Sequence, residues 1–466
     1  MSQQHRRRAP GPASNAVKTA EQEMELAADD GIEVERARTI TDFASHIGDL
    51  ALRAGASAAR TETLVRRAAG AFGLPVQLDV TYSRILISYE PTAATTPITM
   101  MRAVTPDQTD YDRLERVENL VSDVEKDDGL DLETAKARLN HITASPFEYP
   151  RWFRLAAAAL LGAAIVVLLG GGPVDMVVTA VSTMLVDEVR RWLDRWTMGS
   201  FFTTAVCASI PTTLALLALV LQQWAPFTMP TLNLSLVIAA GMVSLLAGMG
   251  TVAAAGDVID GNFLGAAARI LEVVSTTGGI VMGLVATLWL GRSFGVAAQL
   301  EPGASQTPDH VLQLASAGLI ALAFGVRCVM RARALATATV LGIVLWASYL
   351  GAAWITSSHP ARVGIAALVL GFVTRLLVHW VHIPLVALTT TSIASLMPGM
   401  MLYRGVFAIT DEDPTTATWL LLGSTYVAVG LAAGTSFGAM LAAIVLRRRS
   451  EDLHRGRLDL AEQAHG

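Results

Sequence analysis

The sequence predicts an α-helical integral membrane protein with about ten transmembrane helices, arranged as two inverted five-helix halves behind a small N-terminal α+β domain. Three observations support this fold class. Hydrophobic residues make up 52% of the 466 residues. Of the 40 acidic residues, 24 precede Arg151 and only 12 lie between Arg151 and Leu446. Ten apolar segments after residue 150 are separated by loops that alternate between arginine-rich and nearly uncharged.

Residues 1–32 are predicted to be a disordered lead-in, because they combine glycine and proline with many alanine, glutamine and glutamate residues. The basic run near the N-terminus has no apolar stretch behind it, so no secretory signal is predicted. The first domain, residues 33–145, is therefore expected in the cytoplasm. Helical spacing of apolar residues predicts one helix that ends at Gly55 and a second from Ser57 to Ala71.

Alternating β-branched and aromatic residues predict two strands, or one bent strand, over residues 76–89 and a further strand over residues 96–104. Charged amphipathic helices are expected over residues 110–126 and 132–142. The acidic residues between these helices lack the ordered spacing of a calcium loop, so a solvated turn is expected. The domain has no Ser/His/Asp or Cys/His set and no phosphate loop, so neither enzyme activity nor a cofactor or metal is predicted.

The ten predicted spans cover residues 153–170, 173–189, 200–221, 232–254, 265–290, 311–328, 334–354, 362–380, 383–405 and 416–446. With a cytoplasmic start, the arginine-rich loops fall on the inside, as the positive-inside rule requires. An even number of spans places both termini in the cytoplasm. The first half is expected over residues 150–300, the second over 310–448, and a cytoplasmic tail over 449–466.

A weak internal repeat supports the two halves. A shift of 151 residues aligns residues 244–260 with 395–411, and five of the seventeen positions are identical. The first segment runs inward on the fourth span and the second outward on the ninth, which indicates an inverted repeat. Pro398 and Gly399 predict a helix break in the ninth span. The first half has alanine and glycine at the equivalent positions, so a break there is expected to be less secure.

Three segments carry a resemblance to a known family: GASAARTETLVRRAAGAFGLPVQ (55–77), GDVIDGNFLGAAAR (256–269) and SLMPGMMLYRGV (395–406). In this order and spacing, the chain resembles the threonine/serine exporter family, in its fused corynebacterial-type form. The resemblance implies export of threonine and serine across the cytoplasmic inner membrane, driven by the proton motive force. Split two-subunit relatives of this family are linked to dicarboxylate export.

Under the function that the resemblance implies, polar residues inside the spans are candidates for the substrate path, since polar groups are costly in a bilayer. Asp175, Thr179, Ser182 and Thr183 share one face of the second span. They form either a substrate-binding stripe, or an interfacial helix end with hydroxyls that pack between helices.

The fifth span carries Arg269, Glu272 and Thr276 on one stripe. Glu272 is a candidate for proton coupling and Thr276 for substrate binding, although Arg269 and Glu272 are also spaced to pair with each other. Asp257 and Asp260, at the cytoplasmic end of the fourth span, are either further proton-coupling candidates or a solvated pair.

The ninth span holds the remaining substrate-binding candidates, Ser395, Pro398, Gly399 and Arg404. Pro398 and Gly399 would expose backbone groups at the break. Arg404 can hold a substrate carboxylate through its fork of N–H donors. It can equally extend towards a lipid headgroup.

The first functional hypothesis is an alternating-access, proton-coupled exporter of threonine and serine. The second is a dicarboxylate exporter on the same scaffold, which needs more fixed positive charge than Arg404 alone provides. The third is a non-transporting scaffold or sensor. The energetic cost of placing Glu272 within a span argues against it, because a scaffold does not need this charge. The expected partners are an amino-acid substrate, protons and the lipid bilayer, and the net charge of −5 predicts no nucleic acid. The sequence leaves open whether the chain forms a homo-oligomer.

Overall fold

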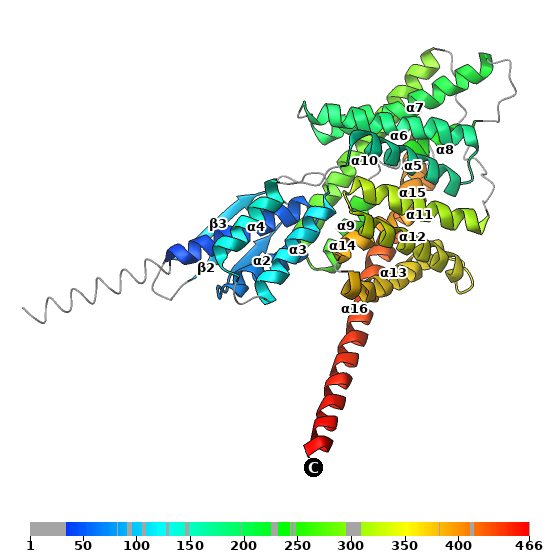
Figure 1. Ribbon diagram of the computed structural model, residues 1–466. Coiled ribbons are helices and arrows are strands. Elements are labelled where there is room, and N and C mark those ends of the chain that lie inside the picture. Colours follow the sequence, from blue (N-terminus) through cyan, green and yellow to red (C-terminus); the bar gives the residue numbers. More distant parts are fainter. Residues whose placement is uncertain are drawn as a thin grey trace, which may run out of the picture.

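The computed structural model describes residues 34–81, 83–90, 96–104, 109–126, 130–144, 149–196, 198–224, 232–242, 245, 248–294, 309–381, 383–410 and 414–465. The lead-in predicted for residues 1–32 lies outside the described residues. Figure 1 shows an N-terminal part with strands and short helices, beside a bundle of longer helices.

The N-terminal part begins with a helix over residues 34–53, after which Gly55 adopts a φ of 99°, in the left-handed region that favours glycine. The helix α2 (Ala58–Ala71) follows, and the Ser57 hydroxyl caps it by accepting a hydrogen bond from Arg60 N. The remaining elements are β1 (Gln77–Val80), β2 (Arg84–Tyr89), β3 (Ile98–Ala103), α3 (Tyr111–Lys126) and α4 (Leu132–Ala144).

The three strands form an antiparallel sheet in the order β1-β2-β3. Ile85 and Ile87 of β2 are fully buried, whereas Leu86 between them is exposed. This alternation follows from the two-residue period of a strand and places one face of the sheet against the helices. Gly48 in the first helix lets Val65 and Ile85 approach its backbone closely.

The bundle contains α5 (Arg151–Leu168), α6 (Pro173–Asp194), α7 (Ser200–Trp224), α8 (Leu234–Met242), α9 (Gly248–Ile259), α10 (Phe263–Ser293), α11 (His310–Arg327), α12 (Ala332–Ala352), α13 (His359–Val381), α14 (Leu385–Ser392), the 3-10 helix η1 (Ile393–Leu396), α15 (Gly399–Thr410) and α16 (Pro414–His465). Within the described residues, seven of these are long and apolar enough to cross a membrane: α5, α7, α10, α11, α12, α13 and α16. The chain is therefore an α-helical membrane protein.

Three of the ten predicted spans are not single long apolar helices. The second span corresponds to α6, which is long enough but carries several charged residues in its last turns, such as Asp187 and Arg191. The fourth span is interrupted between α8 and α9. The ninth is interrupted between η1 and α15.

The starts of the helices repeat along the chain. The starts of α5, α6 and α7 have the same spacing along the sequence as the starts of α11, α12 and α13. The starts of α8, α9 and α10 precede those of α14, α15 and α16 by the same shift that aligns the internal repeat of the sequence. The connection after the third helix is shorter in the second half, so the shift changes there. The bundle therefore consists of two halves with the same order of elements.

The same pair of helices packs closely in both halves, through glycines that correspond under the shift of the internal repeat. Gly283 of α10 lies against the backbone of Ala205 in α7, and Gly434 of α16 lies against the backbone of Gly364 in α13. A Cβ atom at either glycine would overlap the facing carbonyl oxygen. Close helix packing through small residues is typical of membrane bundles.

The two halves meet along their first helices and through their interrupted helices. α5 packs against α11, α9 contacts α16, and α15 contacts α8 and α10. Tyr403 of α15 is buried in a cluster of first-half residues. Val252 of α9, which corresponds to Tyr403 in the repeat, is buried in a cluster that holds second-half residues such as Leu388. The second piece of each interrupted helix therefore enters the opposite half.

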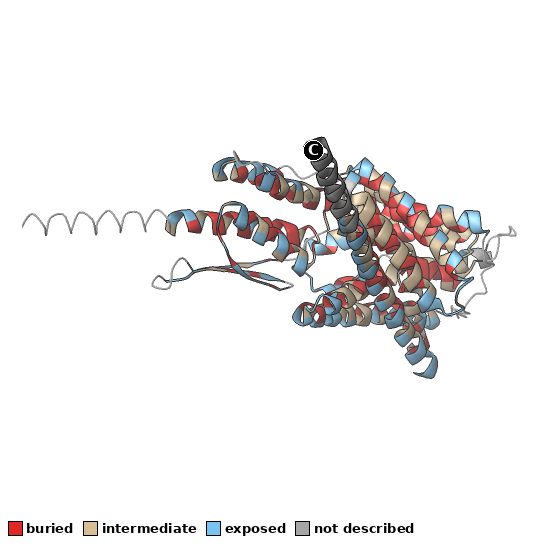
Figure 2. Ribbon diagram, turned by 90° about the horizontal axis from the view of Figure 1, so that it is seen from below, coloured by how far each residue is buried: buried red, intermediate tan, exposed pale blue. Residues whose placement is uncertain are grey.

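Buried positions line the inward sides of the helices both in the bundle and in the N-terminal part (Figure 2). A single apolar cluster joins the two parts, since it contains Leu114 and Val117 of α3 together with Val326 of α11 and Leu388 of α14. The N-terminal part is thus packed on the bundle.

The last helix includes both the predicted tenth span, which ends at residue 446, and the residues of the predicted tail. α16 extends for 52 residues from Pro414 to His465 and runs past the other helices of the bundle (Figure 1). Its sequence after residue 446 consists mostly of arginine, leucine, glutamate and other residues that helices accept, so no local signal ends it.

Candidate functional site

The interrupted helix of the second half contains the break that the sequence predicted. After η1, Met397 has a φ of −59° and a ψ of 140°, and α15 starts at Gly399. Pro398 has no N–H, so it cannot continue the hydrogen-bond pattern of a helix. The Ser395 hydroxyl is buried and has no hydrogen-bond partner among the described atoms. Ser395, Pro398 and Gly399 therefore lie together at the interruption.

The hydroxyls of α14 are largely used within the protein. Thr389 Oγ1 donates to Leu385 O at 2.9 Å and Thr391 Oγ1 to Ala387 O at 2.7 Å, both inside the same helix. Ser392 Oγ donates to Ala338 O of α12 at 3.3 Å. The bond from Ser392 holds the end of α14 against α12, and the chain then continues as η1.

The first half also has a turn at the equivalent place. α8 ends at Met242, Leu245 N donates to Met242 O at 2.8 Å, and α9 starts at Gly248. The other residues between α8 and α9 lie outside the described residues. No proline lies at this position in the sequence.

Asp175 is buried at the start of α6 and connects two helix starts. Its Oδ2 accepts from Gly172 N at 2.9 Å, and its Oδ1 accepts from Asn233 N at 2.9 Å. The Asn233 side chain in turn caps α8 by accepting from Leu236 N at 3.1 Å. The carboxylate therefore fixes the first piece of the interrupted helix to α6.

The rest of the predicted stripe on α6 is also buried, and it faces α5 and α8. Thr183 Oγ1 donates to Ala158 O of α5 at 2.8 Å. Thr179 Oγ1 and Ser182 Oγ are buried without a hydrogen-bond partner among the described atoms. A Cβ atom placed at Gly241 of α8 would lie 2.9 Å from Ser182 Oγ, so this hydroxyl faces the end of α8.

The charged residues around the α9–α10 turn form an ion pair. Arg269 Nε of α10 donates to Asp257 Oδ2 of α9 at 2.7 Å, and Asp257 is buried. Asp260 lies in the turn itself, where loss of surrounding water and the nearby Asp257 carboxylate raise its pKa. Further along α10, Glu272 is exposed and Thr276 is half-buried.

Arg404 lies on an exposed side of α15, next to the buried Tyr403. The buried stripe of α6 packs within the first half. Arg404 is exposed on α15 and is not part of that stripe. The structure thus brings Ser182 together with the end of α8 and places Thr179 against Gly162 of α5. It also brings Asp257 together with Arg269.

Asp187 is a buried charged residue that the sequence analysis did not identify as a candidate. Its Oδ2 accepts from Arg191 at 2.7 Å, and its Oδ1 lies 3.0 Å from Arg327 of α11. The ion pair with Arg327 joins the two halves at the ends of α6 and α11. Asp187 follows Asp175, Thr179 and Thr183 at the same spacing of four residues. This helical period could have identified Asp187 as a buried residue from the sequence.

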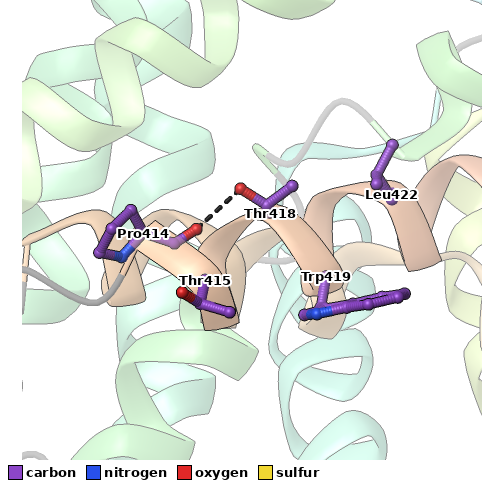
Figure 3. Close-up of a pocket in the computed structure, with 5 residues that line it drawn as sticks. All are labelled: Pro414, Thr415, Thr418, Trp419 and Leu422. Carbon is purple, nitrogen blue, oxygen red and sulfur yellow. Dashed lines mark hydrogen bonds between the residues drawn. The ribbon is translucent and has the colours of Figure 1, made fainter.

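A surface hollow lies at the start of α16, lined by Pro414, Thr415, Thr418, Trp419 and Leu422 (Figure 3). All of these residues belong to one helix, and Thr418 Oγ1 donates to Pro414 O within it at 2.7 Å. Trp419 is 72% exposed. A hollow on the exposed side of one helix is an open surface and not an enclosed binding site.

The described residues contain no group of three His, Cys, Asp or Glu side chains that could hold a metal ion. Of the acidic residues between α3 and α4, Asp131 caps α4 by accepting from Thr134 N at 3.1 Å. Hydrogen bonds from the Thr134 side chain and backbone lower the pKa of Asp131. The two other acidic residues of this turn, 127 and 128, lie outside the described residues.

Comparison with known proteins adds the family. The ThrE family model, for a threonine/serine exporter, matches residues 42–291, and a second model, "Threonine/Serine exporter, ThrE", matches residues 313–441. A protein of Mycobacterium tuberculosis named as a threonine/serine exporter is 28% identical over 421 residues, which cover 88% of this chain and 78% of that protein. The threonine/serine exporter of Corynebacterium glutamicum is 28% identical over 436 residues, which cover 91% of this chain and 86% of that protein. No solved structure matches the chain. Because the first family model matches more than half of its residues, the chain belongs to the threonine/serine exporter family.

Proposed function

We propose that the chain exports threonine and serine across the cytoplasmic membrane by alternating access, driven by the proton motive force. The observation that carries this proposal is the pair of interrupted helices at equivalent positions of two halves. Within a bilayer, irregular backbone survives only where protein or an aqueous cavity supplies its missing hydrogen-bond partners. Secondary transporters use such interruptions to bind substrates and coupling ions.

Each interrupted helix counts as one crossing in this proposal, so each half crosses the membrane five times. An odd number of crossings inverts the second half relative to the first and returns both termini to the cytoplasm. The α6–α7 and α11–α12 connections then lie on the cytoplasmic side, where Arg191, Arg195, Arg331 and Arg333 satisfy the positive-inside rule.

The substrate carboxylate is assigned to the starts of α9 and α15, at Gly248 and Gly399. Helix starts inside a bundle present N–H groups and a partial positive charge, which suit an anionic group. The ammonium group is assigned to the carbonyl groups at the ends of α8 and η1. The buried hydroxyls of Thr179, Ser182 and Ser395 are free among the described atoms to bind a substrate hydroxyl.

Proton coupling is assigned to Asp257, Asp260 and Glu272. The ion pair between Asp257 and Arg269 supports this assignment, because it holds a buried carboxylate beside a counter-charge at the end of α9. Arg404 and Thr276 lie on the neighbouring helices α15 and α10, which contact each other, and complete the proposed path.

Efflux from proteoliposomes tests the proposal. Vesicles are preloaded with radiolabelled threonine, serine or succinate, and efflux is followed with a pH gradient, without one, and with a protonophore. Threonine and serine efflux should depend on the gradient and fall when the protonophore is added. Faster succinate efflux would favour the dicarboxylate exporter instead. Absence of efflux for all three solutes would favour the scaffold or sensor.

A further inference from the structure

Tyr111, the first residue of α3, is buried in the bundle although it belongs to the N-terminal part. Its side chain is only 4% exposed. Its hydroxyl lies beside the Thr390 side chain of α14, and Arg269 of α10 is nearby. Tyr111 also shares one apolar cluster with Val252 of α9 and Leu388 of α14. Tyr111 is therefore buried together with one piece of each interrupted helix.

The backbone around Tyr111 holds the α11–α12 turn. Tyr111 N donates to Cys328 O at 3.0 Å, and Asp112 N donates to Val329 O at 3.1 Å. The Tyr149 hydroxyl donates to Met330 O. Three consecutive carbonyl groups of this turn thus accept hydrogen bonds from residues that precede α5.

The turn depends on these contacts. Val329 has a φ of 53°, and a β-branched residue rarely adopts this left-handed conformation because its side chain crowds the backbone. Strained conformations persist where surrounding contacts over-determine them, and they often mark switching segments. The N–H groups of Tyr111 and Asp112 supply such contacts, because they bind the carbonyl groups directly before and after the Val329 Cα atom.

A charge cluster beside the turn strengthens the same connection. Asp112 is 2% exposed and pairs with Arg116 of α3 at 2.6 Å. It also pairs with Arg331, which starts the connection to α12. A buried carboxylate with two arginine partners is costly to separate, since each charge left behind would be uncompensated.

We propose that Tyr111 is the cytoplasmic gate residue of the transport path, and that the N-terminal part opens and closes the path by withdrawing or inserting this side chain. The inference rests on the proposed function, because it needs a path between α9 and α14. Tyr111 is buried in one apolar cluster with Val252 of α9 and Leu388 of α14, at the end of the bundle that carries Arg269 and Arg331. In the proposed mechanism this buried position of the side chain is the closed state. Substrate can then enter only after the contacts at the α11–α12 turn loosen.

Thiol labelling tests the gate without using a substrate. A cysteine is placed at Thr390 (Thr390→Cys) in a Cys207→Ala, Cys328→Ala background, both native cysteines being buried. A membrane-impermeant maleimide is applied to inside-out vesicles, which expose the cytoplasmic side. Tyr111→Ala should raise the labelling rate about tenfold, because labelling follows the open fraction. Tyr111→Phe should raise it less than about twofold, because the ring still fills the space.

Two matched variants protect the test against misfolding. Arg331→Gln removes a half-exposed partner of Asp112 and should raise labelling about threefold, since it loosens the turn without touching the core. Arg333→Gln, two residues further on and exposed, should leave the rate unchanged. Folding is monitored by size-exclusion chromatography. If Tyr111→Ala does not fold, the labelling rate of Arg331→Gln alone decides whether the gate is accepted.

The outcomes separate the gate from the transport function. Labelling at the parent's rate in folded Tyr111→Ala or Arg331→Gln protein would overturn the gate, whatever is transported. Raised labelling together with absent threonine efflux in the parent would keep the gate and refute the proposed substrate. Raised labelling and a faster downhill threonine leak in Tyr111→Ala vesicles would support both.

Discussion

Asp175 has both of its carboxylate oxygens occupied by backbone N–H groups, from Gly172 and Asn233. The side chain lies in a position that the sequence assigned to the substrate path. A carboxylate that already satisfies two buried donors has limited capacity for a substrate ammonium group. At the scale of single residues, the geometry therefore favours a bracing role, in which Asp175 fixes the orientation of α8 before its interruption.

Replacement of Asp175 by alanine should lower the free energy of unfolding by about 1–3 kcal/mol, because two buried N–H groups lose their acceptor. Thermal denaturation of the detergent-solubilised protein measures the effect. Thr213→Ala is the control, since Thr213 is exposed and its hydroxyl bonds to Ser209 O in the same helix. An Asp175→Ala variant as stable as the parent but inactive in threonine efflux would show that Asp175 acts on the substrate.

The α6 stripe was predictable at this scale because helical spacing is a local property, and Asp175, Thr179, Ser182 and Thr183 do share a buried face. The partners of the charged residues were not predictable. Arg269 pairs with Asp257 across a helix turn. The contacts of Tyr111 with the distant α11–α12 turn depend on how the whole chain packs.

At the scale of elements, apolar segments of about 20 residues predicted where helices occur. The interruption at Pro398 was predictable, because proline removes a donor. The interruption after Met242 was predicted only as the less secure of the two, because no proline marks it. The end of α16 was not predictable, because charge predicts the end of a span and not the end of a helix.

The break at Gly399 gives a prediction for one element. Gly399→Leu should reduce threonine efflux at equal membrane abundance at least about tenfold, because Gly399 is buried and a large side chain would fill the space at the start of α15. Met401→Leu conserves volume on the same helix and should retain efflux within about twofold. Equal efflux from the two variants would place the substrate elsewhere.

The glycine contacts predict equal responses from the two halves. Gly283→Ala and Gly434→Ala should each destabilise the bundle by about 1–3 kcal/mol, because each Cβ would push two helix backbones apart. Gly256→Ala is the control, since nothing lies within 4 Å of a Cβ placed there. Denaturation midpoints of the purified variants provide the measurement. A loss of stability in only one of the two glycine variants would show that the two halves do not share the same helix packing.

At the scale of the whole molecule, the proposed inversion of the two halves predicts the location of the connections. A reporter fused after Arg195 or after Arg333 should lie in the cytoplasm, whereas one fused after Thr356, between α12 and α13, should lie outside. Paired cytoplasmic and extracytoplasmic reporters measure this in cells. A fusion after Arg195 that reports from outside would contradict the count of five crossings in each half, and with it the inversion.

The contact between Tyr111 and the α11–α12 turn also constrains biosynthesis. Cys328 is translated long after Tyr111. At ~5–20 residues per second, their separation of roughly 200 residues corresponds to a delay of roughly 10–40 s. During that delay the apolar side of α3 has left the ribosome while its docking surface has not yet been made. The N-terminal part must therefore fold first and dock last, only after the second half has been inserted, and a chain that stalls before residue 328 leaves this apolar surface open to chaperones and proteases.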